Sequence, residues 1–135
     1  MSIAKTASPV DIAVSGLQAQ SMRLKVIGNN IANANTERTE TGQPYRRQDV
    51  ILSTDEQGLS GVRIGGVNVD ATTPFPLEYR PGDPRADADG FVKTPNVQIP
   101  IEMMRMMAAS RAYQANAAVL KRYQQNIDVT LELLK

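Results

Sequence analysis

Residues 8–34 read SPVDIAVSGLQAQSMRLKVIGNNIANA and repeat apolar side chains every seven positions. Such a repeat forms the seam of a coiled coil, so the segment is predicted to be a long helix that pairs with another. Ser8 and Pro9 suit its start, as N-cap and first-turn proline. A second apolar row flanks this seam, so the helix has more apolar surface than packing against one partner helix would bury. The seam rows are Val10, Leu17, Leu24 and Ile31, and Ala13, Gln20, Ile27 and Ala34; the flanking row is Ile12, Ala19 and Val26.

The last third of the chain carries a second and longer repeat of the same kind. Pro100 and Glu102 mark the start of a helix that runs for about 35 residues, or roughly 50 Å. That length is typical of a coiled coil or a helical assembly. Small residues on a flanking face would let another backbone approach closely. The seam rows are Ile99, Met106, Tyr113, Leu120, Ile127 and Leu134, and Met103, Ser110, Ala117, Gln124 and Leu131; the flanking row is Ala108, Ala112, Ala115 and Val119.

The segment between the two helices has a different composition. It holds six of the eight prolines and most of the nine glycines, which excludes long helices there. Short β-like runs bounded by turn residues predict a small antiparallel sheet, too poor in aromatic residues to be stable without the helices. These runs are residues 46–52, 62–69, 77–79 and 91–93.

The predicted fold class is therefore α+β, with two terminal helices packed as a coiled-coil-like pair and a small β-rich insert between them. We expect an N-terminal helical arm in residues 1–36, the insert in residues 37–96 and a C-terminal helical arm in residues 97–135. The two arms would form one helical assembly domain.

The composition of the 135 residues argues against most chemical functions. The chain has no histidine and no cysteine, so it lacks the commonest general base, the commonest metal ligands and any thiolate nucleophile. No cofactor and no catalytic site are expected. A net charge of +1 gives no reason to expect a nucleic-acid partner, and the basic pair Arg46 and Arg47 is expected on a strand surface.

Nothing in the sequence predicts a membrane span or a cleaved secretory signal. No run approaches the roughly 20 apolar residues that a transmembrane helix needs. The N-terminal residues also lack the continuous apolar run of a signal peptide. We expect the chain to be synthesised in the cytoplasm. Export by a route that does not cleave a signal peptide is compatible with this sequence.

Two local motifs have ordinary explanations. Residues 83–90 resemble part of a calcium loop, but the loop register would put Arg85 at its first position and Asn96 at its last, where acidic ligands are required. A turn closed by Asp89 and Gly90 is the better interpretation. The glycines of residues 61–66 match no nucleotide-binding pattern. The methionine-rich run EMMRMMAASRAY, residues 102–113, fits a core, an adaptable interface, or both on different faces.

Four asparagines, Asn29, Asn30, Asn33 and Asn35, crowd the end of the first helix. Asparagine is unfavourable inside a helix, because its amide competes for backbone groups. A helix end explains Asn35, but Asn29 and Asn30 lie more than a turn earlier. The alternative is that Asn30 and Asn33 bridge closely packed helices, within or between subunits, and fix their register.

Several motifs resemble a known family. Residues 30–36, NIANANT, resemble the N-terminal signature of the bacterial flagellar axial proteins, the rod and hook subunits. Residues 106–116, MMAASRAYQAN, are similar to the C-terminal motif of the same family. The short length, with residues 42–50 (GQPYRRQDV) and 94–97 (TPNV), looks like the proximal-rod members. The sequence departs from the pattern at Gln98 and Ile99, where Asn-Pro is usual, and at Gly28 and Asn29, where small residues are common.

The resemblance implies a structural subunit of the basal-body rod. It would assemble through its terminal helices, with copies of itself and with other rod subunits, into the drive shaft that crosses the periplasm and transmits torque for motility. The resemblance also implies passage through the flagellar type III export apparatus without signal cleavage. The expected assembly interface comprises Leu17, Leu24, Ile27, Asn30, Ile31, Asn33, Met106, Tyr113, Asn116, Leu120, Ile127 and Leu131.

An alternative function is a soluble coiled-coil adaptor or export chaperone that binds one helical partner. It would explain the seven-residue repeats, but not the matched terminal motifs around a β insert. An enzyme is a more distant third possibility.

Overall fold

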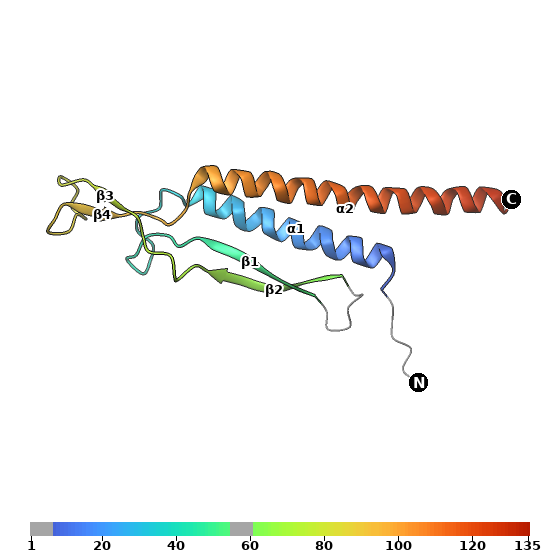
Figure 1. Ribbon diagram of the computed structural model, residues 1–135, viewed down its shortest axis with the longest axis horizontal. Helices are drawn as coiled ribbons and strands as arrows, with labels where there is room; N and C mark the ends of the chain where they lie inside the picture. Colours follow the sequence, from blue (N-terminus) through green and yellow to red (C-terminus); the bar gives the residue numbers. More distant parts are fainter. Residues whose placement is uncertain (1–6, 55–60) are drawn as a thin grey trace, which may run out of the picture.

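The computed structural model of the chain describes residues 7–54 and 61–135 (Figure 1). Two long helices run side by side in opposite directions, and four short strands lie between them in the sequence. This confirms the predicted fold class. The elements are α1 (Pro9–Ala32), β1 (Gln48–Thr54), β2 (Val62–Val69), β3 (Leu77–Tyr79), β4 (Phe91–Lys93) and α2 (Ile99–Leu133).

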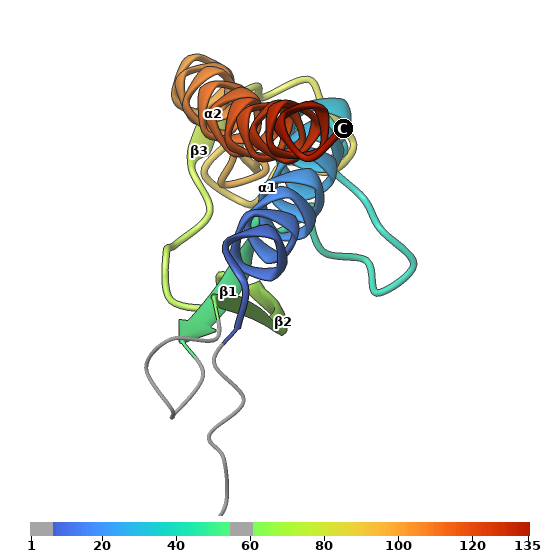
Figure 2. The same cartoon turned by 90° about the vertical axis from the view of Figure 1, so that its right-hand side faces the viewer.

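The elongated molecule has three layers over the length of α1. In the end-on view α1 lies between α2 and the β1–β2 hairpin (Figure 2). The β3–β4 hairpin sits at the end where α1 finishes and α2 begins (Figure 1). The expected single sheet is thus wrong, because the described strands form two separate antiparallel pairs. They are separated by a turn in which the Asp70 carboxylate accepts bonds from Thr72 and Thr73.

The two ends of α1 are set by short side chains. At the start, Ser8 Oγ accepts a hydrogen bond from the Asp11 amide at 3.2 Å, and the Asp11 carboxylate accepts one from the Ser8 amide at 3.1 Å. At the end, Asn33 is the C-cap, and its side-chain amide donates to the Asn29 carbonyl at 2.9 Å. The helix therefore ends at Ala32, two residues before the end of the predicted segment.

Strand β1 begins two residues later than predicted, at Gln48. Just before it, the Arg47 amide donates to Asn96 Oδ1 and not to a neighbouring strand. The Arg46 guanidinium donates to the carbonyls of Asp70 and Thr73 and lies 4.1 Å from the centre of the Phe75 ring. These contacts hold Arg46 against the following loop, so the expectation that the basic pair lies on a strand surface is wrong.

The β1–β2 hairpin is attached to α1 by a close backbone contact. Ser15 Oγ accepts a hydrogen bond from the Val62 amide at 3.0 Å. Gly61 has φ +84°, and a Cβ there would lie 2.3 Å from Ser15 Oγ. Only glycine combines this backbone conformation with so close an approach. The hairpin consequently covers one side of α1, leaving the opposite side of that helix to pack against α2.

The face that α2 turns toward α1 differs from the predicted one. Its buried residues are Glu102 and Ala109, whereas Met103, in the predicted companion row, is 55% exposed. The contact face is rotated by one position, because Glu102 is drawn inward by polar partners. Gly16 of α1 allows the close approach further along, since a Cβ there would lie 2.8 Å from the Asn116 side chain.

The flanking apolar rows behave differently on the two helices. On α1, Ala19 and Val26 are buried within the chain, so the expectation that this row awaits a partner is wrong for them. On α2 the flanking row stays on the surface, with Val119 49% exposed. The core of the described residues is small and mostly aliphatic. Its apolar members are Ala13, Ala19, Val26, Ile27, Ala34, Tyr45, Val50, Val92 and Ala109.

Candidate assembly interface

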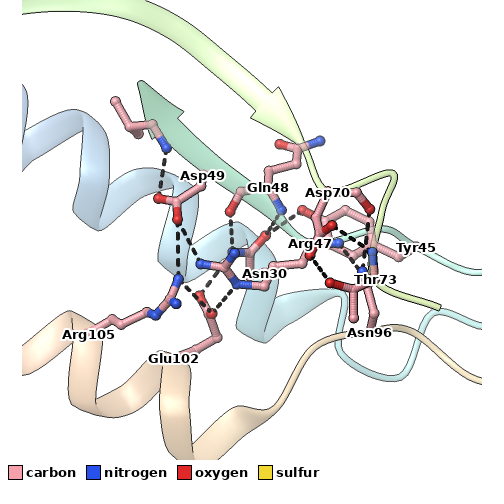
Figure 3. A network of polar contacts seen from close by, with 11 residues as sticks. Asn30, Tyr45, Arg47, Gln48, Asp49, Asp70, Thr73, Asn96, Glu102 and Arg105 are labelled. Atoms are coloured by element: carbon pink, nitrogen blue, oxygen red, sulfur yellow. Dashed lines mark hydrogen bonds and ion pairs between the residues drawn. The ribbon is translucent and has the colours of Figure 1, made fainter. Parts of the chain in front are cut away.

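A buried polar cluster joins α1, α2 and the start of β1 (Figure 3). We define it as Asn30, Tyr45, Arg47, Asn96 and Glu102. Asn30 is completely buried and lies at its centre. The cluster is where the three parts of the molecule meet.

Every hydrogen-bonding position of the Asn30 side chain is occupied. Its Nδ2 donates to the Gln48 carbonyl at 2.8 Å and to Glu102 Oε2 at 2.9 Å. Its Oδ1 accepts from the Tyr45 hydroxyl and from the Gln48 amide, both at 2.9 Å. An amide can donate two bonds and accept two, so Asn30 is saturated. One side chain therefore links α1 to both α2 and β1.

Glu102 places a carboxylate in the interior with only 1% of its surface exposed. A buried carboxylate is costly unless it is paired and hydrogen-bonded. Arg47 Nε donates to Oε1 of this carboxylate at 2.7 Å, and Asn30 Nδ2 donates to Oε2. Glu102 also lies in the first turn of α2, where the positive end of the helix dipole favours a negative charge.

The cluster extends from Arg47 to the segment that leads into α2. The Arg47 amide donates to Asn96 Oδ1 at 2.7 Å, and Arg47 Nη2 pairs with Asp49 at 2.9 Å. Burial raises the pKa of the Tyr45 hydroxyl, which accepts a bond from Asn29 while donating to Asn30. The phenol stays protonated and can keep donating.

These bonds give the cluster a mechanical role. Its amide and carboxylate groups are already engaged by the protein, so it offers no free ligand set. Among the described residues no group of metal-ligating side chains occurs either. The cluster fixes how far α1 and α2 can slide past each other, because any shift along the helix axis would break several bonds at once.

Sequence analysis identified Asn30 but missed its partners. Glu102 was seen only as a helix-start residue, and Tyr45 and Arg47 were given no role. One signal could have found Glu102, since it is the single charged residue in residues 94–104, a largely apolar run. Asn33 does not bridge helices within the chain; it caps α1, and its Oδ1 accepts from Thr36 Oγ1 at 3.2 Å.

The predicted interface residues fall into three groups by exposure. The buried ones belong to the helix pair itself, and the exposed ones lie on the outer surface of α2. Ile27 and Asn30 are buried; Leu17, Leu24, Ile31, Asn33, Met106, Asn116 and Leu120 are half-buried; Tyr113, Ile127 and Leu131 are 40%, 44% and 56% exposed.

The helix α2 extends past the start of α1 (Figure 1), and this part carries exposed apolar side chains, among them Val129 and Leu133. Residues 121–135 are all exposed, and Leu133 is 82% exposed. None of the helices in the described residues is apolar enough over a sufficient length to span a membrane. An uncovered apolar face of this kind usually marks a protein contact.

The same two ends of the chain match family models of known proteins. Residues 11–38 match a model described as flagella basal body rod protein, and residues 88–133 match one described as flagellar basal body rod FlgEFG protein C-terminal. The flagellar basal-body rod protein FlgC of Salmonella typhimurium is 44% identical over 126 residues, covering 91% of this chain and 93% of its own. The chain belongs to the FlgC family of flagellar basal-body rod proteins.

More distant FlgC proteins match over similar lengths. That of Agrobacterium fabrum is 42% identical, with 92% of this chain and 91% of its own covered. That of Borreliella burgdorferi is 38% identical, with 84% and 87% covered. Membership of the FlgC family makes the protein a structural subunit of the bacterial flagellar rod. The two matched regions contain Asn30 and Glu102 respectively, so the central bond of the polar cluster connects them.

Proposed function

We propose that the subunit assembles through its terminal helices, with copies of itself and with other rod subunits, and that the rod so formed transmits torque. The observation that carries this proposal is the apolar surface of α2 beyond α1, where Ile127 and Leu131 are 44% and 56% exposed. Heterologous contacts that do not close generate helical assemblies, and each subunit then needs two different surfaces. A long helix with one covered and one uncovered part meets this need.

The arms, residues 1–36 and 97–135, would act as one assembly domain, with residues 37–96 as an insert that stiffens it. The Asn30–Glu102 bond supports this division, because it locks α1 to α2 while Gln48 ties the insert to the same point. A shaft under torque needs subunits whose helices do not slip. Buried polar groups that fix register are a known way to achieve this, at some cost in stability.

Partners and location follow from the family. We infer that the subunit lies in the proximal rod, crosses the periplasm as part of the basal body, and is exported by the flagellar type III apparatus without signal cleavage. Catalysis is not part of this role. The absence of cysteine and histidine from the sequence and the full use of the buried polar groups support a purely structural function.

The assembly interface proposed from the sequence can be tested with one charge. Leu120 is half-buried at the point where α2 leaves α1, and Gln114 is exposed on the part of α2 that packs on α1. Leu120→Asp should abolish incorporation into basal bodies and motility, while circular dichroism and amide exchange report a folded β1–β2 hairpin. Gln114→Asp adds the same single negative charge at an exposed position of the same helix and should leave motility intact. Normal motility of the Leu120→Asp strain would contradict the proposal.

A further inference from the structure

Two separate sets of contacts attach the β3–β4 hairpin to the rest of the subunit. Among the described helices and strands, β3 and β4 contact each other and no other element. The hairpin projects from the end where α1 finishes and α2 begins (Figure 1). What holds it must therefore come from its base and from the loops around it.

The base of the hairpin is fixed by hydrogen bonds to backbone carbonyls and to one amide side chain. The Arg46 guanidinium donates to the Asp70 and Thr73 carbonyls, on the segment that leads into β3. On the segment that leads out of β4, the Asn96 side chain accepts from the Arg47 amide and donates to the Asp70 carbonyl at 3.4 Å. Because Arg47 belongs to the polar cluster, the base is tied to the helix pair.

Beyond the base, a single carboxylate holds the hairpin. Glu37 follows α1, and its side chain is only 13% exposed. Its Oε1 lies 2.9 Å from Arg80 Nη1, and its Oε2 lies 2.6 Å from Arg85 Nη1. Both arginines lie in the connection between β3 and β4. Across residues 7–54 and 61–135 no other ion pair joins the hairpin to the rest of the chain. We define the latch as Glu37, Arg80 and Arg85.

The backbone beside Glu37 is held firmly to the body of the subunit. The Thr36 amide donates to the carbonyl of Asn33, the C-cap of α1, at 3.0 Å. The Tyr45 amide donates to the Thr36 carbonyl at 2.9 Å, and Tyr45 is a member of the polar cluster. The latch therefore connects the hairpin to the same centre that fixes α1 against α2.

The two arginines keep carboxylate partners without Glu37. Asp83, in the same connection, accepts from Arg85 Nε at 2.9 Å and from Arg85 Nη2 at 2.7 Å. Arg85 lowers the pKa of the Asp83 carboxyl to about 2, so this partner stays ionised. Arg80 likewise pairs with Glu78 on β3. Separation from Glu37 thus leaves neither arginine unpaired, and an unpaired charge is the main cost of breaking such a contact.

Apolar packing adds little to the latch. A hollow of about 320 Å³ lies between residues 37–44 and the hairpin, with Pro44 and Val92 in its lining. Val92 is the one buried residue of the two strands, whereas Leu77 and Tyr79 are 57% and 64% exposed. The charged residues Arg38, Asp87 and Lys93 also line the hollow. One buried apolar side chain and the latch are thus what keep the hairpin against the body.

We propose that the β3–β4 hairpin is a hinged arm that the latch holds docked, and that it turns outward about its base when Glu37 no longer pairs with the two arginines. The arginine side chains are 36% and 42% exposed, so salt weakens the latch. The open arm changes the outline of this end of the subunit, while the polar cluster keeps α1 and α2 in register. The inference goes beyond the proposed function and does not depend on it, because assembly was argued from α2.

Distances between two spin labels measure the position of the arm, and labelling is simple because the chain contains no cysteine of its own. In the full-length chain, Ala88→Cys labels the exposed connection of the hairpin and Lys25→Cys labels an exposed position of α1. Glu37→Gln should raise the ratio of open to docked arms at least about tenfold. Raising sodium chloride from about 0.1 M to about 1 M, which shortens the Debye length from about 10 Å to about 3 Å, should act in the same direction on the wild-type arm.

Glu40→Gln is the matched control. Glu40 is exposed in the same loop and forms no ion pair with any residue that the structure describes. It should leave the ratio of open to docked arms at the wild-type value. A second label pair, Lys25→Cys with Gln114→Cys on α2, should report one unchanged distance between the helices in every variant.

A double-mutant cycle tests the route of the effect. Arg85→Gln alone should open the arm partly, because Arg80 still pairs with Glu37. In the Glu37→Gln chain, Arg85→Gln should add nothing to the ratio, because its partner outside the hairpin is already gone.

Three outcomes would overturn the hinged arm. The first is the same distance distribution for Glu37→Gln and Glu40→Gln. The second is a changed α1–α2 distance in the Glu37→Gln chain, since the hairpin would then belong to a body that loosens as a whole. The third is an equal effect of Arg85→Gln with and without Glu37. In each case the proposed function stands, because Leu120→Asp tests it on α2.

Discussion

The side chain of Asn30 shows how one residue can set the position of three elements. Its two donors and two acceptor positions are used by Glu102, Tyr45 and both backbone groups of Gln48. An aspartate could not donate, and a leucine could neither donate nor accept. Replacing Asn30 would leave several buried groups unpaired, and each such group costs about 1–3 kcal/mol. The helix tolerates the poor propensity of asparagine here because the contacts are specific.

Two arginines near the same carboxylate should differ strongly in their contribution to stability. Arg47 donates to Glu102 at 2.7 Å from a side chain only 16% exposed, whereas Arg105 lies 3.9 Å away and is 44% exposed. Arg47→Met should lower the free energy of unfolding by about 3 kcal/mol, because it leaves a buried carboxylate unpaired. Arg105→Met should cost less than about 1 kcal/mol. Urea titrations of both variants check this, and equal losses would contradict it.

At the residue scale the sequence predicted a bridging role for Asn30 but did not predict which residues it contacts. Four asparagines near a helix end were conspicuous, since the residue type is rare inside helices. Glu102 and Arg47 are ordinary surface residue types, and only the folded chain brings positions 30, 47 and 102 together. The turn closed by Gly90 was predictable because it is local, and its φ of +83° is what glycine permits.

Glycines on α1 have opposite effects depending on which face they occupy. Gly28 has open space around it, so Gly28→Ala should stabilise the subunit by about 1 kcal/mol through helix propensity. Gly16→Ala should lose that gain, because the added Cβ would displace Asn116 from its bond to the Ala112 carbonyl. Thermal or urea unfolding of the two variants gives the comparison.

A double-mutant cycle provides the control for the glycine comparison. With Asn116→Ala the obstruction is absent, so Gly16→Ala should then stabilise as Gly28→Ala does. If Gly16→Ala is as favourable as Gly28→Ala with Asn116 present, the helices are less closely packed there than the geometry indicates.

Helix existence was predictable from the repeats, whereas the contact face of α2 was not. A seven-residue repeat with several apolar rows leaves the rotation of the helix undetermined by about one position. The choice is made by Glu102, which the polar cluster buries, and by two small buried residues at separate points of the helix contact, Gly16 of α1 and Ala109 of α2. Both features depend on contacts with α1, so the apolar repeat of α2 alone does not predict them.

On the scale of the whole molecule, support for the long helix is uneven. The first half of α2 packs on α1, which in turn rests on the β1–β2 hairpin (Figure 2). Residues 121–133 are exposed throughout, and an isolated helix of about a dozen residues is marginal in water. The free subunit should therefore open locally from its C-terminal end before any other part of α2 unfolds.

Limited trypsin digestion measures this difference within one helix. Lys121 and Arg122 lie where the packing of α2 on α1 ends, and Arg111 is also exposed, in the part of α2 that packs on α1. In the free subunit, cleavage after Lys121 or Arg122 should come first, and cleavage after Arg111 should be slower, because it requires unpacking of α1 from α2. In purified basal bodies the first sites should be protected, since assembly would cover residues 121–133. Early cleavage at Arg111, or equal protection of all three sites before assembly, would mean that residues 121–133 are as stable alone as the part of α2 that packs on α1. The subunit would then have no unsupported segment for assembly to order.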